Sequence, residues 1–305
     1  MTLNKIIEKI KDKITGKLIS DYNLSKSSWF NIGGNAKIFF KPENIKELSL
    51  FIKTIANELP IYVIGRGSNL LIRDGGFNGA VVKLGKSFSH ISLFNECTLI
   101  AGASALDKKV SEFAYENSIS GFEFLSCIPG SIGGAIRMNS GCYKEDMSQK
   151  VLSIQAMNMN GIVTTIPSSK VNFFYRGCDL NEDLIFLSVT LKGYTRQKEE
   201  IKQKMKKLIN DKEKSQPNKI KTCGSTFKNP KEKSSKKAWE LIKFAKCDNY
   251  KVGGAKISEQ HCNFFLNDGS AKAKDLESLI YKVKKEVFEK TGINLEPELK
   301  IIGNE

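Results

Sequence analysis

The chain has 305 residues, of which 40% are hydrophobic and 27% are charged, and its formal net charge is +15. This composition is typical of a globular protein, and the length predicts two or three domains or one large one. No apolar run approaches the ~18 residues that a membrane-spanning helix requires, and the N-terminus lacks the apolar core of a signal peptide. We therefore expect a cytoplasmic protein that does not enter a membrane.

The first two thirds of the chain alternate between helical and strand patterns. Residues 65–76 form a turn-rich loop, and residues 130–141 are rich in glycine. Apolar spacing and β-branched runs predict the remaining elements. We expect helices at 3–14, 43–59 and 106–118, and strands at 36–42, 61–65, 80–84, 98–103, 151–158, 162–167, 173–176 and 184–194.

The pattern changes near residue 196, where a highly charged helical segment begins. Because this segment has no long apolar run, we expect a domain boundary there, with domains at 1–84, 85–198 and 199–305. The last domain combines both patterns, so the fold class is α+β, with mixed sheets. We expect helices at 197–215, 235–246 and 271–291, a strand around 225–228 and a last strand near 295–303 that returns to the first domain.

The charged and sulfur-containing residues exclude some classes of protein. Of the 48 basic residues, 43 are lysines spread along the chain, which is typical of a solvated surface and not of a nucleic-acid site. The seven cysteines are odd in number and show no CxxC spacing, which argues against a disulfide framework and against a zinc site. We expect no bound metal and no nucleic acid. Excess positive charge would attract a polyanionic small molecule.

Two loops are dense in glycine and small polar residues. The first is GRGSN at 65–69, and the second is IPGSIGGA at 128–135, continuing to NSG at 139–141. Successive amides in such turns bind anions, and the second loop precedes a predicted helix. Neither loop is a GxGxxG fingerprint or a P-loop. Together they favour a cofactor that carries a pyrophosphate.

The stretch KTCGSTFKNP at 221–230 contains two candidate nucleophiles, Cys223 and Ser225. A nucleophilic serine or cysteine usually needs a base, most often a histidine, and the chain has only His90 and His261. By itself Ser225 reads as a turn residue, Arg176 in FFYRG as an ion-pair partner, and Glu298 as a solvated strand residue. Cys223 is expected to be a small packing residue.

The ordered set of motifs adds a resemblance to a known family. The set is NIGGNAKIFFKP, IGRGSNLLIRDGGFNGAVVKL, CIPGSIGGAIRMNSGCY, FFYRG, CGSTFKNP, GGAKISEQHCNFFLNDGSA and LEPELKIIG, from about residue 27 to the end. It resembles the UDP-N-acetylenolpyruvoylglucosamine reductases, flavoenzymes of peptidoglycan synthesis. The resemblance implies a vanillyl-alcohol-oxidase-type FAD-binding fold of two subdomains and a substrate-binding domain. It also implies non-covalent FAD, and NADPH and UDP-N-acetylglucosamine enolpyruvate as substrates.

The resemblance also assigns roles to residues of this chain. It implies that Ser225 donates a proton, that Arg176 stabilises charge on the substrate, and that Glu298 either donates a hydrogen bond or orients its neighbours. Substrate contacts are expected at Lys228, Asn229 and Gln260, with His261 at least as well explained as a structural histidine. Cofactor contacts are expected at Gly65, Arg66, Gly67, Ser68, Asn69, Leu70, Ile128, Pro129, Gly130, Ser131, Gly133, Gly134, Ala135, Asn139 and Gly141.

The chain resembles the shorter type of this family, because 176–196 leaves no room for a tyrosine-bearing insertion. The residues that grip the UDP diphosphate and the oligomeric state do not follow from the sequence. Two alternatives remain open at this point. One is another FAD oxidoreductase of the same superfamily with a different substrate, and the other is a basic nucleic-acid-binding protein.

Overall fold

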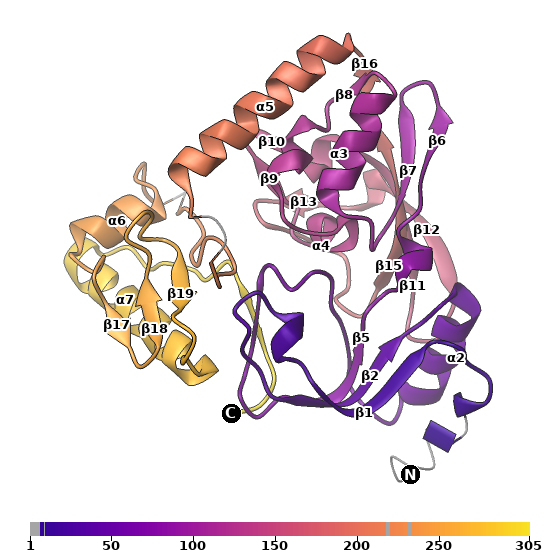
Figure 1. Cartoon of the computed structure of the whole chain (residues 1–305), viewed down its shortest axis with the longest axis horizontal. Coiled ribbons are helices and arrows are strands. Elements are labelled where there is room, and N and C mark those ends of the chain that lie inside the picture. Colours follow the sequence, from indigo (N-terminus) through magenta and orange to yellow (C-terminus); the bar gives the residue numbers. More distant parts are fainter. Residues whose placement is uncertain (1–6, 9, 218–219, 231–232) are drawn as a thin grey trace. The chain divides into compact units, whose positions relative to one another are not determined.

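The computed structural model describes residues 7–8, 10–217, 220–230 and 233–305 (Figure 1). These residues form two compact units. Of the described residues, unit 1 comprises 7–8, 10–20, 37–66 and 79–212, and unit 2 comprises 21–36, 67–78, 213–217, 220–230 and 233–305. The chain therefore passes between the units several times, and one of these crossings lies between Arg66 and Gly67, within the first glycine-rich loop.

A four-stranded sheet carries the N-terminal part of the chain. Its strand order is β1-β2-β5-β3, with β3 parallel to β5. The helix α2 begins after Asn44, whose side chain accepts a hydrogen bond from the N–H of Glu47. Its apolar face packs on buried residues of this sheet, such as Phe40, whose ring stacks on that of Phe51 at 4.3 Å. The elements are β1 (Lys17–Asn23), β2 (Asn35–Lys41), α2 (Ile45–Ile55), β3 (Ile61–Val63) and β5 (Phe77–Val82).

A five-stranded antiparallel sheet forms the rest of unit 1. Its order is β12-β11-β15-β7-β6, and the helices α3 and α4 pack with it around one apolar core. Short strand pairs β8–β16, β9–β10 and β13–β14 surround it. The elements are β6 (Ile91–Asn95), β7 (Thr98–Gly102), α3 (Asp107–Glu116), β8 (Ile119–Ser120), α4 (Ile132–Arg137), β9 (Gly141–Cys142), β10 (Glu145–Asp146), β11 (Val151–Met157), β12 (Val163–Pro167), β13 (Phe173–Phe174), β14 (Gly177–Cys178), β15 (Ile185–Lys192) and β16 (Tyr194–Thr195).

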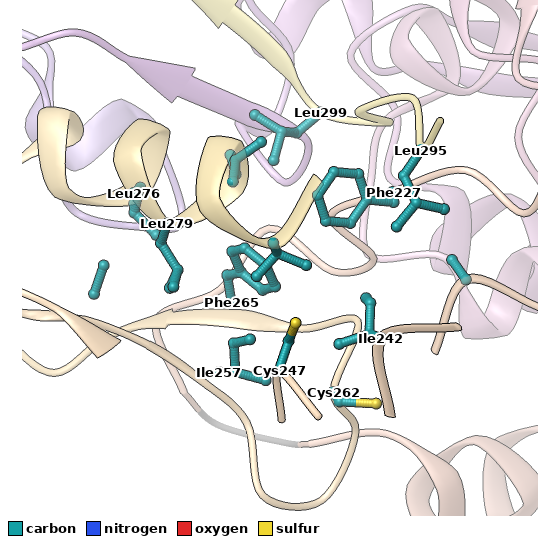
Figure 2. Packing of buried hydrophobic residues seen from close by; sticks show 14 of the residues in the cluster. Phe227, Ile242, Cys247, Ile257, Cys262, Phe265, Leu276, Leu279, Leu295 and Leu299 are labelled. Carbon is teal, nitrogen blue, oxygen red and sulfur yellow. The ribbon is translucent and has the colours of Figure 1, made fainter. Parts of the chain in front are cut away.

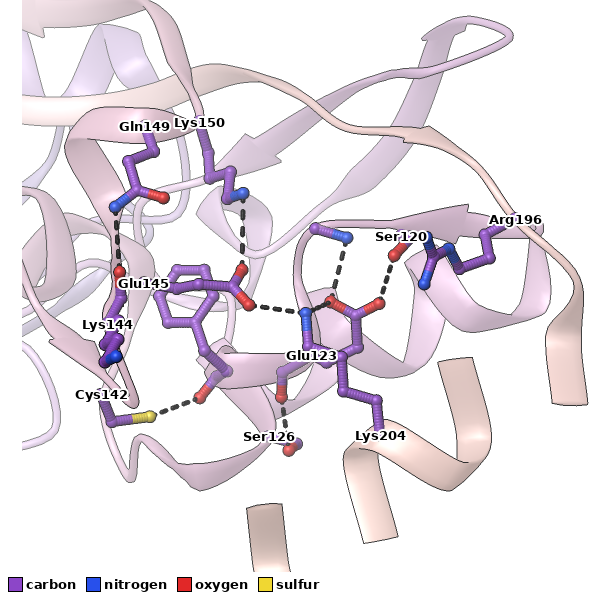
Figure 3. A network of polar contacts seen from close by, with 12 residues as sticks. Ser120, Glu123, Ser126, Cys142, Lys144, Glu145, Gln149, Lys150, Arg196 and Lys204 are labelled. Carbon is purple, nitrogen blue, oxygen red and sulfur yellow. Dashed lines mark hydrogen bonds and ion pairs between the residues drawn. The ribbon is translucent and has the colours of Figure 1, made fainter. Parts of the chain in front are cut away.

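The charged helix α5 (Lys198–Ser215) is attached to unit 1 by a buried ion network (Figure 3). Lys204 Nζ lies 3.2 Å from the Glu123 carboxylate and 2.5 Å from that of Glu145. The Glu123 side chain is 1% exposed and also accepts hydrogen bonds from Ser120 and Gly121. Burial raises the pKa of Glu123, but these hydrogen bonds and the Lys204 charge hold it below its ordinary value. Lys204 therefore compensates a carboxylate that has no access to water.

Unit 2 is built around a single apolar cluster (Figure 2). The antiparallel sheet β17-β18-β19 packs on α7, and β20 pairs in parallel with β4. Phe227 lies in this core at 1% exposure, edge-on to Phe265 at 5.8 Å. The elements are β4 (Leu70–Ile72), α6 (Ala238–Phe244), β17 (Lys251–Val252), β18 (Ala255–Ile257), β19 (Phe265–Asn267), α7 (Ala273–Thr291) and β20 (Lys300–Ile302), with 3-10 turns elsewhere at Ser25–Ser27, Lys86–Phe88, Glu123–Cys127, Met147–Gln149 and Ser168–Lys170.

The predicted elements agree with this fold in most places. The mixed α+β composition is confirmed, and so are the helices at 43–59, 106–118, 197–215, 235–246 and 271–291, each within a few residues. The loop predicted at 65–76 contains the short strand β4, and the strand expected at 225–228 is present only as isolated bridges. The helix predicted at 3–14 lies partly outside the described residues. Among the described helices, none combines the length and apolarity that crossing a membrane requires.

Candidate active site

The first glycine-rich loop, residues 65–69, connects β3 to β4. Among the described residues, no protein acceptor receives a hydrogen bond from the N–H groups of this loop. Gly67 has φ +69°, and a Cβ there would lie 1.9 Å from the carbonyl oxygen of Ser27. Only glycine can therefore hold this turn. The loop presents a row of unused amide donors, which is the arrangement that binds anions.

The second glycine-rich loop, residues 128–135, leads into α4, as predicted. It reaches the first loop within unit 1, since a Cβ on Gly65 would lie 2.7 Å from the Ser131 hydroxyl. Gly133 packs against Ala103, whereas a Cβ on Gly134 would meet no atom within 4 Å. Open space thus lies beside the first turn of α4, next to the point where the two loops meet.

The buried carboxyl group of Asp107 packs against Gly130 of the second loop. Asp107 is 0% exposed, and among the described residues its two side-chain oxygens have no hydrogen-bond partner. Its backbone N–H donates to the Gly130 carbonyl at 3.3 Å, and a Cβ on Gly130 would lie 2.5 Å from Asp107 Oδ2. Burial raises the pKa of Asp107 well above its ordinary value. Burial therefore favours the neutral form of this carboxyl group.

Residues 139–141, which continue the second glycine-rich loop, form hydrogen bonds with the segment that carries Arg176. The Asn139 side chain donates to the Phe174 carbonyl at 3.1 Å and accepts from the Ser148 N–H at 2.9 Å. Arg176 Nη2 donates to the Gly141 carbonyl at 3.2 Å. Arg176 has φ +63°, a left-handed conformation that costs a non-glycine residue about 1 kcal/mol. The surrounding hydrogen bonds fix this guanidinium at a half-buried position.

Ser225 lies in a segment of unit 2 that pairs with two other segments of the chain. Ser225 forms an antiparallel bridge with Phe264, and Phe227 forms one with Pro297. The Asn263 side chain accepts from the Phe227 N–H at 3.0 Å and donates to its carbonyl at 2.9 Å. The segment is thus fixed in the core at Phe227 while Ser225 stays half-buried.

Glu298 follows Pro297, which forms a bridge with Phe227, and it contacts the first glycine-rich loop. Its N–H donates to the Thr226 carbonyl at 2.8 Å, and its own carbonyl accepts from Asn69 Nδ2 at 3.1 Å. Ser225 and Glu298 are therefore on neighbouring segments. Glu296, two residues earlier, is exposed and lies 3.9 Å from Lys228 and 3.6 Å from Lys233.

The other candidates in unit 2 already have partners. The Asn229 side-chain oxygen accepts from the N–H of Ala238 at 2.9 Å, where α6 begins. Gln260 is exposed, and its amide donates to the Gln216 carbonyl at 3.2 Å. His261 packs against Trp239 and Phe264, its Nδ1 accepts from a backbone N–H, and burial lowers its pKa. A structural role explains His261 fully.

Cys223 is not arranged as a nucleophile. It is buried, and its thiol donates to the Leu70 carbonyl at 3.4 Å. Burial raises the pKa of this thiol to about 11. Cys223 is therefore protonated at neutral pH, and it packs the start of the Ser225 segment against the end of the first loop.

The two loops fit a cofactor with a pyrophosphate group. They combine unused amide donors, an opening beside Gly134 and a buried carboxyl group whose neutral form is favoured. These features define a protein that binds a nucleotide cofactor through its backbone. Residues 36–166 match a family model described as an FAD binding domain, and FAD is the cofactor.

Comparison with known proteins identifies the family. Residues 216–302 match the model of the UDP-N-acetylenolpyruvoylglucosamine reductase C-terminal domain. The UDP-N-acetylenolpyruvoylglucosamine reductase of Pelagibacter ubique is 50% identical over 296 residues, covering 97% of this chain and 98% of the relative. That of Rickettsia prowazekii is 44% identical over 290 residues, covering 95% and 97%. The chain belongs to the UDP-N-acetylenolpyruvoylglucosamine reductase family.

A solved structure supports the same assignment for the fold. The UDP-N-acetylenolpyruvylglucosamine reductase of Thermus caldophilus matches with a TM-score of 0.81 and 31% identity, covering 94% of this chain and 99% of that one. The family resemblance and the FAD cofactor are thereby confirmed. The nucleic-acid-binding alternative is no longer needed to explain the basic charge.

Sequence reasoning missed two positioning residues. Asn263 hydrogen-bonds to the backbone of Phe227, and Asp107 packs against Gly130. Asn139 was expected to contact the cofactor, and in the structure its amide donates to Phe174 and accepts from Ser148. The available signal was weak in each case. Asn263 interrupts an aromatic run, and Asp107 is the first residue of a helix, where an acidic side chain is common on the surface.

Proposed function

We propose that this chain reduces the enolpyruvyl group of UDP-N-acetylglucosamine enolpyruvate to give UDP-N-acetylmuramate, with NADPH as the source of hydride. The reaction serves peptidoglycan synthesis, and we place it in the cytoplasm, where NADPH is available. One observation carries the proposal. The part of the chain that matches the reductase C-terminal domain model places Ser225 and Glu298 on paired segments.

The two glycine-rich loops would hold FAD, which, once reduced by NADPH, would supply a hydride for the enolpyruvyl double bond. Addition leaves negative charge on the carbon next to the substrate carboxylate, and this charge has to be stabilised and then neutralised by a proton. We assign stabilisation to Arg176. Its guanidinium is always charged and presents a planar pair of donors to a carboxylate. Its fixed conformation supports this role, because a donor that is already oriented loses little entropy in the reaction.

We assign the proton to Ser225. A serine hydroxyl is a very weak acid, so it donates only to a strongly basic centre, and a carbanion-like carbon is such a centre. This role needs no neighbouring base, which agrees with the neutral, structurally occupied His261. Burial of Phe227 and the two hydrogen bonds between the Asn263 side chain and the Phe227 backbone hold the Ser225 segment in place.

Glu298 has two possible contributions, and both are part of the proposal. If its carboxyl is protonated, it donates a hydrogen bond to the developing charge. If it is ionised, it orients Ser225 or Arg176. Its backbone links the Ser225 segment to Asn69 of the first glycine-rich loop, so a change at Glu298 reaches both.

We assign contacts with the UDP-sugar to Lys228, Asn229 and Gln260. Lys228 is the strongest of these, because its ammonium group lies 3.9 Å from the exposed Glu296 carboxylate in a weak pair that a diphosphate can replace. The oxygen of Asn229 is engaged by α6, which leaves its NH₂ group for a ligand.

The function is tested by product analysis. Purified protein with FAD is incubated with NADPH and UDP-N-acetylglucosamine enolpyruvate, and the sugar is examined by mass spectrometry. We expect the sugar to gain two hydrogen atoms, in an amount equal to the NADPH oxidised. Oxidation of NADPH that leaves the sugar unchanged would instead support an FAD oxidoreductase with another substrate.

A further inference from the structure

We propose that Lys41 and Lys83, together with Arg66, form a cationic edge of the cofactor site that neutralises the pyrophosphate of FAD. Neither lysine is among the cofactor contacts expected from the sequence. All three residues belong to unit 1. The inference rests on FAD as the cofactor, and it does not depend on which substrate the flavin reduces.

The three cations lie where three neighbouring strands end. Lys41 is the last residue of β2, Lys83 directly follows β5, and Arg66 lies in the loop that follows β3. The sheet order places β5 between β2 and β3 (Figure 1). β3 is parallel to β5, and β2 has the same direction, since Asn35 at its start lies against Gly76, directly before β5. The carboxyl ends of parallel strands form the edge at which open sheets bind ligands.

Backbone hydrogen bonds place the two lysines opposite each other. The N–H of Lys83 donates to the Phe40 carbonyl at 2.9 Å, so in this parallel ladder Lys83 lies opposite Lys41. On the other side of β5, the N–H of Ile64 donates to the Val82 carbonyl at 2.9 Å, which brings the start of the Arg66 loop beside Lys83. The ends of all three strands are therefore in one row.

The two lysines share the face of the sheet that α2 does not cover. Phe40 and Val82, the residues before Lys41 and Lys83, belong to the apolar core that includes α2. Because side chains alternate along a strand, both lysines point to the opposite face. The Lys41 side chain also lies close to the turn after β5, since a Cβ on Gly85 would be 3.4 Å from Lys41 Cε.

This row of cations has no counter-charge in the part of the chain that the structure describes. There, none of the three side chains forms an ion pair or a hydrogen bond. Lys41 and Lys83 are half-buried, and burial, followed by the charges of Arg66 and Lys41, lowers the pKa of Lys83. Like charges directly opposite each other on neighbouring strands destabilise a sheet. The arrangement is therefore unfavourable in the free protein, and a bound anion relieves it.

The position of the row identifies the anion. Arg66 adjoins Gly65, and a Cβ on Gly65 would lie 2.7 Å from the Ser131 hydroxyl of the second glycine-rich loop. The cations thus lie beside the point where the two loops meet in unit 1. Amide groups fix phosphate oxygens in place but leave their negative charge without a full counter-charge, which cationic side chains supply. We therefore assign the row to the FAD pyrophosphate.

The test measures FAD binding by Lys41→Met and Lys83→Met through flavin fluorescence titration at low salt, and their thermal unfolding without FAD. Methionine keeps an apolar stem and removes the charge. Each variant should raise the FAD dissociation constant roughly ten-fold. The free variants should be as stable as the wild type or more stable, because the like-charge contact is lost. Lys37→Met is the matched control, since Lys37 is exposed and lies earlier on β2, and it should leave both values unchanged.

Salt and a charge-keeping variant separate the electrostatic role from a packing role. Salt should weaken FAD binding by the wild type more than by the methionine variants, and Lys83→Arg should bind FAD nearly as well as the wild type. Unchanged FAD affinity in both methionine variants would overturn the proposal, and so would a raised KM for NADPH with unchanged FAD affinity. Weaker FAD binding that is accompanied by an equal loss of stability in the FAD-free variants would also overturn it, because the lysines would then support the fold.

Discussion

The backbone N–H of Glu298 donates a hydrogen bond of 2.8 Å to the carbonyl oxygen of Thr226, the residue after Ser225. Ser225 and Glu298, which are 73 positions apart in the sequence, are thereby placed on neighbouring segments of unit 2. The carbonyl of Glu298 accepts from Asn69, so the same strand end also holds the first glycine-rich loop. This connection links the motif LEPELKIIG at the end of the chain to both the Ser225 segment and the first glycine-rich loop.

Gly134→Ala should weaken FAD binding without destabilising the free protein. A Cβ at this position meets no protein atom, and alanine favours the helix by up to about 1 kcal/mol. If the opening accommodates the cofactor, the methyl group should raise the FAD dissociation constant at least ten-fold. Flavin fluorescence titration measures this constant, and thermal unfolding without FAD measures stability.

Gly133→Ala is the matched control for that experiment. A Cβ there would lie 3.1 Å from the Ala103 side chain, so this variant should lose stability with or without FAD. Equal FAD affinity in Gly134→Ala and wild type would show that the opening is not part of the cofactor site.

Arg176→Lys should slow sugar reduction by roughly a hundred-fold and leave reduction of the flavin by NADPH nearly unchanged. Lysine keeps the charge but loses the planar pair of donors and the orientation fixed by Gly141. Single-turnover kinetics resolve the two half-reactions. Arg196→Lys serves as the control, because Arg196 is exposed and pairs only with Glu200 and the Tyr194 ring among the described residues. A similar loss in both variants would argue against a special role for Arg176.

Lys204→Met should lower the free energy of unfolding by about 1–3 kcal/mol, because Glu123 would keep its buried charge without the compensating ammonium group. Urea unfolding at neutral pH gives the value, with the exposed Lys206→Met as the control. The double variant Lys204→Met/Glu123→Gln should recover part of the loss. Because the folded-state pKa of Glu123 is lowered, its contribution to stability is present above its ordinary pKa and declines as the pH falls through the folded-state value.

Asp107→Asn should stabilise the protein at neutral and alkaline pH. The folded-state pKa of Asp107 is raised, so its favourable contribution is complete below the ordinary aspartate pKa and is lost as the pH rises toward the folded-state value. The variant removes this loss and should flatten the dependence of stability on pH above the ordinary aspartate pKa. Unfolding midpoints that run parallel for both proteins over this range would contradict a neutral Asp107.

Local patterns predicted the long helices well, because α2, α3, α5 and α7 each bury an apolar stripe that the spacing already displays. The strand β4 was missed because it has three residues and its partner β20 lies about 230 residues away. Periodicity carries no information about such pairing. The segment around Ser225 reads as a strand but has only isolated bridges, since side chains such as Asn263 hold its backbone.

The candidate site was predictable where backbone chemistry decides, as in the glycine-rich loops. Roles of single side chains came only from the resemblance of the motifs to a family. Supporting residues such as Asp107 and Asn263 could not be found in this way, because burial and partners, and not residue type, define what they do.

The most direct test of the account follows the flavin absorbance of Ser225→Ala and wild-type protein under anaerobic conditions, first with NADPH and then with UDP-N-acetylglucosamine enolpyruvate. We predict that NADPH bleaches both proteins at similar rates. The sugar should restore the colour of the wild type, and of Ser225→Ala roughly a hundred- to ten-thousand-fold more slowly. Equal slowing of both half-reactions, or recovery of Ser225→Ala at the wild-type rate, would contradict Ser225 as the proton donor.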